Sequence, residues 1–181
     1  DMPITNKHFL WLMVEEIGLD AIAEKVKRPL TDLRIRPFYG CYIVRPTDRL
    51  GIDREHPRDT YLHSLIEALG GTVVDYAGQY KCCGFPIITM ARENSLKQAG
   101  RHLGDAIDAD ADCLVTPCPL CHLTLDLQQP LAEKVVGRRE GLGLFAAECD
   151  PDATGQSRTR WSGNSLRSAA GKCREIRAPA A

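Results

Sequence analysis

Five cysteines stand where their thiols could act together on one inorganic group. They are Cys41, Cys82, Cys83, Cys118 and Cys121, with the spacing C-x40-CC-x34-C-x2-C. They lie in segments containing glycine or proline, at the ends of apolar runs. Soft thiolate ligands at this density select zinc, copper(I) or iron–sulfur clusters. Four thiolates suffice for tetrahedral zinc or a cubane cluster, so the fifth needs an explanation of its own.

The adjacent pair Cys82-Cys83 is the most unusual part of this set. Neighbouring residues of a strand point to opposite faces, so both thiols can address one object only where the backbone leaves regular structure. Gly84 and Pro86, which follow the pair, predict that it does. If both are ligands, the two thiols could bind two different irons or share one, in a cluster whose shape departs from a cube.

Three predicted strands deliver the cysteines, and predicted helices separate them. The strands are expected at 33–39, 71–76 and 113–116, and the helices at 59–69, 87–107 and 119–129. Pro119 suits a first helical turn, which would place Cys118 at the N-terminus of that helix. The alternation predicts an α/β fold, a short parallel sheet flanked by helices, with the cysteine motifs at the C-terminal ends of the strands. Ligands bind at that edge in open α/β sheets.

One domain accounts for most of the 181 residues. We expect a cysteine-rich domain at 1–136, which begins with two short helices within 8–27. Residues 137–181 carry Arg, Ser, Gly and Ala without apolar periodicity and are predicted to form a mobile tail.

Charge and hydropathy narrow the class of partner. The net charge of -1 and the pI near 6.6 give no electrostatic reason to expect nucleic acid or an anionic membrane surface. The longest apolar run, 9–14, is too short to cross a bilayer, so any membrane association is expected through a partner subunit. No secretory signal pattern opens the sequence, which predicts a cytoplasmic protein.

Three motifs carry a resemblance to a known family. YGCYIVRP at 39–46, CCG at 82–84 and CPLC at 118–121 resemble the cysteine-rich CCG domain of the heterodisulfide reductase B-subunit family, over about 9–136. Relatives occur in some succinate dehydrogenases and in glycolate or lactate oxidase complexes. Family members usually carry two such domains, and this chain contains one.

The resemblance implies both a cofactor and a role. Cys41, Cys82, Cys83, Cys118 and Cys121 would bind a non-cubane [4Fe-4S] cluster. The chain would be an iron–sulfur subunit, or a fragment of one, in a multisubunit oxidoreductase, where it transfers electrons coupled to thiol–disulfide reduction. Its partners would be other iron–sulfur or flavoprotein subunits and a small thiol or disulfide substrate.

Two other interpretations of the cysteines remain open. Zinc needs only four of the five sulfurs, so the domain could be a zinc-binding structural or interaction module of a dehydrogenase complex without a redox role. A thioredoxin-like dithiol at Cys118 and Cys121 is the other, because a helix N-terminus lowers the pKa of a thiol. The dithiol leaves Cys41, Cys82 and Cys83 unexplained.

Several residues outside this set have simpler roles. Cys113 opens an apolar strand and is predicted to be a core thiol. His122 is expected on a helix surface, with a hydrogen bond toward a neighbouring sulfur as the alternative. His63 and His102 have no partner pattern and are predicted to face solvent. Trp11 is expected in the core or at a subunit contact.

Overall fold

The computed structural model describes residues 6–137, and three strands form a parallel sheet within them. They are β1 (Arg34–Pro37), β2 (Thr72–Val73) and β3 (Cys113–Val115). The order is β2-β1-β3, and Ile35 of β1 pairs with Val73 on one side and Cys113 on the other. The predicted α/β fold with a short parallel sheet is confirmed. Each strand is shorter than predicted. After β1, the Tyr39 N–H donates to the carbonyl oxygen of Gln79, outside the sheet, and Gly40 then turns the chain.

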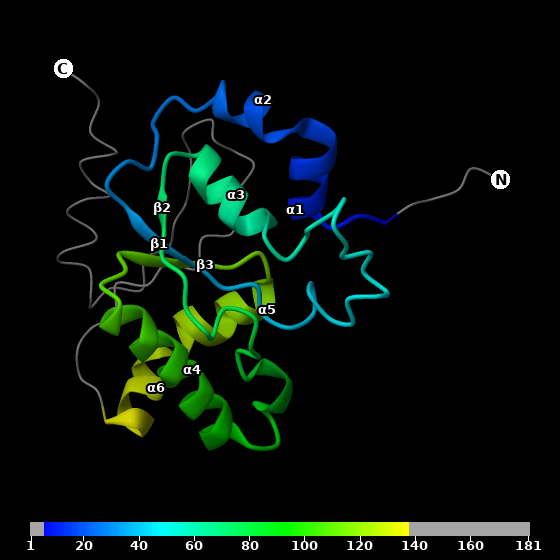
Figure 1. Cartoon of the computed structure of the whole chain (residues 1–181). Coiled ribbons are helices and arrows are strands. Elements are labelled where there is room, and N and C mark those ends of the chain that lie inside the picture. Colours follow the sequence, from blue (N-terminus) through cyan, green and yellow to red (C-terminus); the bar gives the residue numbers. More distant parts are fainter. Residues whose placement is uncertain (1–5, 138–181) are drawn as a thin grey trace.

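One face of the sheet is covered by the N-terminal helices and by the helix that follows β1 (Figure 1). These elements are α1 (Phe9–Leu12), the π-helical turn η1 (Met13–Ile17), α2 (Leu19–Ala23) and α3 (Tyr61–Ala68). Gly18, with φ +85°, separates η1 from α2, as the sequence predicts for the end of the first helix.

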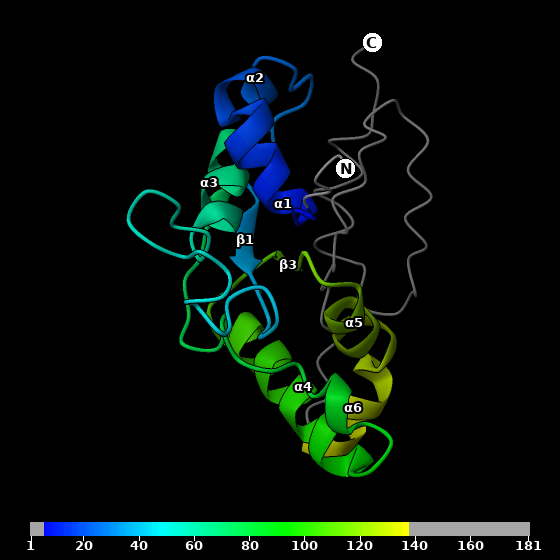
Figure 2. The same ribbon diagram turned by 90° about the vertical axis from the view of Figure 1, so that its right-hand side faces the viewer.

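The opposite face is covered by the later helices, as the view turned by 90° also shows (Figure 2). They are α4 (Arg92–Asp108), α5 (Pro119–His122), the π-helical turn η3 (Leu123–Leu127) and α6 (Gln129–Val136), with the 3-10 turn η2 (Phe85–Ile87) before α4. No helix within residues 6–137 has the length and apolar character needed to cross a bilayer.

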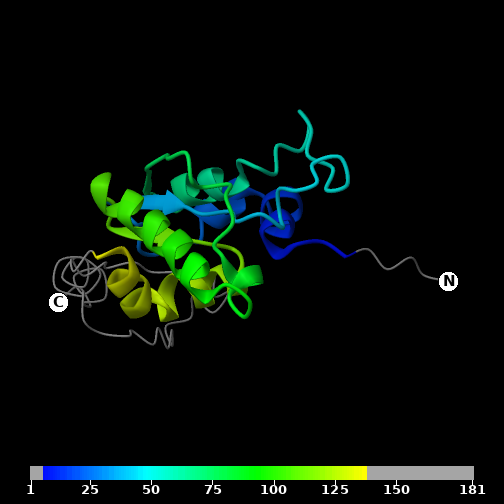
Figure 3. The same cartoon turned by 90° about the horizontal axis from the view of Figure 1, so that it is seen from below.

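The predicted helix at 119–129 is confirmed as far as Leu127, where α5 and η3 follow each other without a break, and a second helix, α6, begins at Gln129. Pro130 lies in the first turn of α6 and has no N–H to donate to the preceding turn, so the chain restarts there as a new helix. α6 then lies beside α4 (Figure 3), where a Cβ on Gly100 would come within 2.6 Å of Val136 Cγ1. The absence of a side chain at Gly100 therefore permits this close packing.

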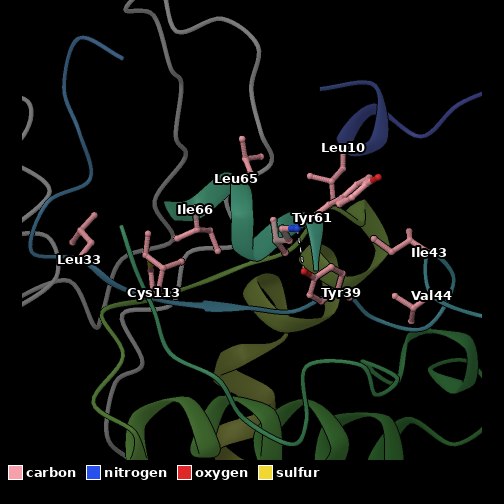
Figure 4. Packing of buried hydrophobic residues seen from close by; sticks show 11 residues of the cluster. Leu10, Leu33, Tyr39, Ile43, Val44, Tyr61, Leu65, Ile66 and Cys113 are labelled. Carbon is pink, nitrogen blue, oxygen red and sulfur yellow. Dashed lines mark hydrogen bonds between the residues drawn. The ribbon is translucent and has the colours of Figure 1, made fainter. Parts of the chain in front are cut away.

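The core consists of two clusters, one on each side of the sheet. Ile35 and Tyr39 pack against Leu62 and Leu65 of α3 (Figure 4). The second cluster lies on the side of α4 and contains Phe38, Cys83, Leu96, Ala99, Leu103, Leu114, Cys121 and Leu125. Successive strand residues alternate between these clusters, as the pleat requires. Two of the predicted ligands, Cys83 and Cys121, thus belong to the second cluster.

An ion-pair group holds the N-terminal helices in place. Arg58 donates from Nε to Glu15 Oε1 (2.6 Å) and from Nη2 to Glu15 Oε2 (3.2 Å), and Lys7 Nζ lies 2.8 Å from Oε2. The Arg58 guanidinium lowers the pKa of Glu15 to about 2. The Arg58 guanidinium also lies over the Trp11 ring, 4.3 Å from its centroid. Trp11 is partly buried and packs against the hydrophobic cluster on the α3 side, which agrees with the expected place in the core.

The crossovers place the cysteine motifs at one edge of the sheet. The β1-to-β2 connection runs through α3 on one face, and the β2-to-β3 connection returns past β1 through α4 on the other (Figure 1). A reversal of this kind opens a crevice at the C-terminal ends of the strands, where ligands bind in open α/β sheets. Residues 138–181, which include most of the predicted tail, lie outside the described residues. The domain boundary at 136 therefore stays a prediction.

Candidate metal centre

The segment that carries Cys41 follows β1, and Gly40 precedes the cysteine. Gly40 has φ +73°, a left-handed conformation that glycine adopts without a Cβ penalty. A Cβ built on Gly40 would stand 2.8 Å from Cys121 Sγ. The segment that carries Cys41 therefore touches the thiol of the third cysteine segment.

The doublet lies outside every helix and strand, between β2 and η2, as predicted. Gly84, with φ +95°, turns the chain into η2. The Gly84 N–H donates to Cys82 Sγ (3.4 Å), and the Phe85 N–H donates to Cys83 Sγ (3.5 Å). Each sulfur of the doublet thus accepts a hydrogen bond from a backbone N–H group, and at Cys83 this bond favours the anionic form.

The third segment begins α5. Cys118 is the N-cap residue and Pro119 occupies the first turn, which confirms the prediction from the sequence. The Cys118 N–H donates to Thr116 Oγ1 (3.3 Å), a residue that is fully buried. The backbone N–H groups of Cys121 and Leu120 lie near the Cys118 sulfur and contribute to lowering its pKa.

Contacts between thiols join the three segments. The Cys121 thiol lies within interaction distance of the thiols of Cys118 and Cys83, and the Cys41 thiol lies within interaction distance of Cys82. Cys41 also lies close enough to Cys83 for an electrostatic interaction. The structure therefore brings all five predicted site residues together, and their role as ligands stays a prediction.

The same contacts change the acidity of these thiols. The hydrogen bond from Cys121 lowers the pKa of Cys118 to about 6 and that of Cys83 to about 7. The pKa of Cys121 is raised, because its single S–H proton is held by the neighbouring sulfurs of Cys118 and Cys83. Burial, followed by the proximity of Cys82, raises the pKa of Cys41. Thiolates are the form that binds metals, and the one S–H of Cys121 favours that form at one of its two neighbours at a time.

Thiols are the whole of the candidate donor set. Among residues 6–137, no group of three or more His, Cys, Asp or Glu side chains is arranged around one metal position. The five thiols come from three segments and make contacts in small groups. Thiolates are the ordinary ligands of iron–sulfur clusters, which distribute them over several irons. The residues present therefore fit a polynuclear cluster in their chemistry.

The five thiols differ in access to solvent. Cys83 and Cys121 are each 3% exposed, whereas Cys41 is only half-buried. Beside Cys41 lies an open depression of about 620 Å³, lined by Cys41, Tyr42, Arg45, Pro46, Thr47 and Asp48. A reactant from solution can therefore approach the group from the side of Cys41.

Sequence reasoning missed His102, which is 4% exposed and not solvent-facing as predicted. Its Nε2 donates to the carbonyl oxygen of Cys82 (3.0 Å), and its ring packs edge-on against Phe38 with centroids 5.0 Å apart. Burial lowers the pKa of His102. A signal was available, since His102 lies three residues after Ala99 on the buried stripe of α4.

The prediction that His63 faces solvent is also wrong. The Tyr39 hydroxyl donates to His63 Nδ1 (2.6 Å), and His63 Nε2 donates to Asp75 Oδ1 (2.7 Å). The same hydroxyl accepts from the backbone N–H groups of Leu62 (3.0 Å; Figure 4) and His63 (3.2 Å). This network anchors the first turn of α3 to the residue before Gly40.

Two further expectations concern His122, which follows Cys121 in the sequence, and Cys113. His122 Nε2 lies 3.7 Å from Asp126 Oδ2, and within residues 6–137 its buried Nδ1 has no hydrogen-bond partner. The alternative of a hydrogen bond from His122 to a sulfur is therefore not observed. Cys113 is 7% exposed in the cluster on the α3 side, which confirms its role as a core thiol.

Comparison with curated proteins gives relatives among the components of reductases. The chain is 34% identical over 131 residues to an 8-methylmenaquinol:fumarate reductase membrane anchor subunit of Wolinella succinogenes, covering 72% of this chain and 45% of that protein. It is 32% identical over 126 residues to the B subunit of the ferredoxin:CoB-CoM heterodisulfide reductase of Methanosarcina mazei, covering 68% and 41%. A protein of Archaeoglobus profundus that is described as like the B subunit of heterodisulfide reductase is 28% identical over 131 residues, covering 71% and 44%.

The chain spans less than half the length of each of these relatives. The family described as "Cysteine-rich domain", CCG, matches residues 35–126, which include the five thiols and the three strands that precede them. The resemblance stated from the three cysteine motifs is confirmed, and the chain belongs to the CCG cysteine-rich domain family.

Proposed function

We propose that this chain holds an iron–sulfur cluster through Cys41, Cys82, Cys83, Cys118 and Cys121. In this role it acts as an electron-transfer subunit of a multisubunit oxidoreductase. The observation that carries the proposal is the meeting of five thiols from three strand exits, with Gly40 against Cys121 Sγ. The similarity to reductase subunits supports the oxidoreductase context.

The proposed cluster is a [4Fe-4S] group of non-cubane type, because five thiols exceed the four that a cube uses. When bound, it would supply one-electron redox chemistry and an open or strained iron that can meet a substrate sulfur. The chain's own contribution is to orient and stabilise the sulfurs. The N–H groups of Gly84 and Phe85 offset negative charge on the doublet. The second hydrophobic cluster excludes water from Cys83 and Cys121.

The proposed substrate is a small thiol or disulfide, which would enter through the depression beside Cys41. Reducing a disulfide to two thiols consumes two electrons and two protons, and a partner subunit carrying iron–sulfur or flavin groups would deliver the electrons. Exposed Arg45 and Asp48 give the depression one cationic and one anionic group for a polar substrate. The proposed location is the cytoplasm, with membrane association through a partner subunit, and the membrane anchor relative supports the association.

Anaerobic purification or reconstitution of the full chain tests the proposal. We expect a brown protein with iron and acid-labile sulfide, and visible absorption that disappears on oxidation in air. Cys83→Ser should change the electron paramagnetic resonance spectrum and lower iron content. The matched control is Cys113→Ser, which alters a thiol on the other face of the sheet and should leave both unchanged. A colourless anaerobic protein with stoichiometric zinc would instead establish the structural module.

A further inference from the structure

The side chain of Cys83 is held in the second hydrophobic cluster, whereas the backbone of the Cys82-Cys83 doublet has no regular secondary structure to support it. The N–H groups of Gly84 and Phe85 reach the sulfurs of the doublet from only two residues away. The carbonyl of Cys82, in contrast, accepts a hydrogen bond from His102, which lies twenty residues later on α4. This bond links the doublet to the longest helix of the described residues.

We infer that His102 is a positioning residue, which holds the Cys82-Cys83 peptide so that both thiols face the metal centre. The inference rests on the proposed function. A peptide group is planar, so fixing the Cys82 carbonyl also fixes the direction in which the chain enters Cys83. The relative orientation of the two side chains is then set by one bond from α4. His102 thereby acts on the sulfurs through the backbone.

The ring of His102 is itself held on several sides. Phe38 packs edge-on against it, and a Cβ on Gly78 would stand 2.9 Å from its Nδ1. Because Nε2 donates to the Cys82 carbonyl, the neutral ring carries its proton on Nε2 and a lone pair on Nδ1. The ring therefore has little freedom to turn away from the doublet.

A role in packing alone does not account for a histidine here. The Nδ1 atom is buried and has no hydrogen-bond partner in the part of the chain that the structure describes. A buried polar atom without a partner is unfavourable and calls for a reason. Phenylalanine or leucine would fill the same apolar surroundings without an unpaired nitrogen. What only a histidine-like donor supplies at this position is the bond to Cys82.

The test compares three variants of the full chain after anaerobic reconstitution. His102→Phe removes the donor and keeps an aromatic ring, and His102→Gln retains an N–H group in the place of Nε2. Ile66→Val, in the hydrophobic cluster on the α3 side, is the stability control. The measurements are the rate of iron release to a chelator and the electron paramagnetic resonance spectrum of the reduced cluster. Circular dichroism establishes that each variant is folded.

We expect His102→Phe to release iron about ten-fold faster or more, the scale that supporting hydrogen bonds have at metal sites, with an altered spectrum. His102→Gln should recover much of this loss, and Ile66→Val should release iron at the wild-type rate. Equal release rates and spectra in the wild-type and His102→Phe proteins would overturn the inference. If His102→Phe does not fold, His102→Leu takes its place, because it also removes the donor and keeps an apolar side chain. The same ten-fold criterion then decides the outcome.

A wild-type chain that binds no iron would refute the proposed function, and the inference would then be decided on the metal-free protein. Amide hydrogen exchange at Cys83 and Gly84, measured by mass spectrometry, should be faster in His102→Phe than in the wild type and Ile66→Val. Unchanged exchange at these two amides would overturn the inference independently of the cluster.

Discussion

Replacing Gly40 with alanine is the sharpest test of how the sheet edge forms the centre. Gly40 has φ +73° and a place for a Cβ only 2.8 Å from Cys121 Sγ. Gly137 offers a matched control, since its φ is +72° and, among residues 6–137, no atom lies within 4 Å of its Cβ position. Both alanine variants carry the same backbone cost, and only Gly40→Ala meets a sulfur.

The expected loss of stability differs between the two variants. A left-handed conformation costs an alanine about 1–2 kcal/mol, which applies at both positions. Nonbonded atoms prefer separations of about 3.5–4.0 Å, so Cys121 Sγ must move by about 1 Å in Gly40→Ala. Such overpacking of a buried site costs about 1–3 kcal/mol more. We expect a total of about 2–5 kcal/mol for Gly40→Ala, and about 1–2 kcal/mol for Gly137→Ala.

Urea denaturation of the metal-free chain measures both costs, and iron per chain after reconstitution measures the effect on the centre. Metal ligands tolerate displacements of only about 0.2 Å, so Gly40→Ala should also bind less iron. Gly137→Ala should bind as much as the wild type. Equal stability and equal iron content in the two variants would refute the contact between the Cys41 segment and Cys121.

Three further predictions concern the stability of the folded chain and the question of which cysteines bind iron. Glu15→Gln should lower the free energy of unfolding at neutral pH by up to about 3 kcal/mol, because Arg58 lowers the pKa of Glu15 from 4.5 to about 2. That contribution is present above pH 4.5 and lost as the pH falls toward 2, so urea titrations across this range should converge for the wild type and the variant. Tyr39→Phe should cost about 1–3 kcal/mol in the same assay, since two backbone N–H groups at the start of α3 lose their acceptor. Cys113→Ala should retain full iron content by metal analysis, and a loss would place that thiol at the centre.

Much of the candidate site could be predicted from local patterns. Three segments with strand propensity, each followed by a cysteine motif, indicated that the cysteines follow the C-terminal ends of strands at one edge of the sheet. β1, β2 and β3 lie where these patterns predicted them. Pro119 placed Cys118 at the start of a helix, and Gly84 took the doublet out of regular structure. These features depend on residues within a few positions of each other, so the sequence alone could indicate them.

Contacts across the fold could not be predicted in the same way. The order β2-β1-β3, the approach of Gly40 to Cys121 and the hydrogen bond from His102 to Cys82 each join segments far apart in the chain. The helical period of α4 indicates that position 102 faces inward, and it does not indicate which carbonyl lies opposite. The sequence by itself determined which residues could bind a metal and which elements carry them. Only the tertiary structure decided which sulfurs meet and what holds them, because these contacts depend on how α3 and α4 pack on opposite faces of the sheet.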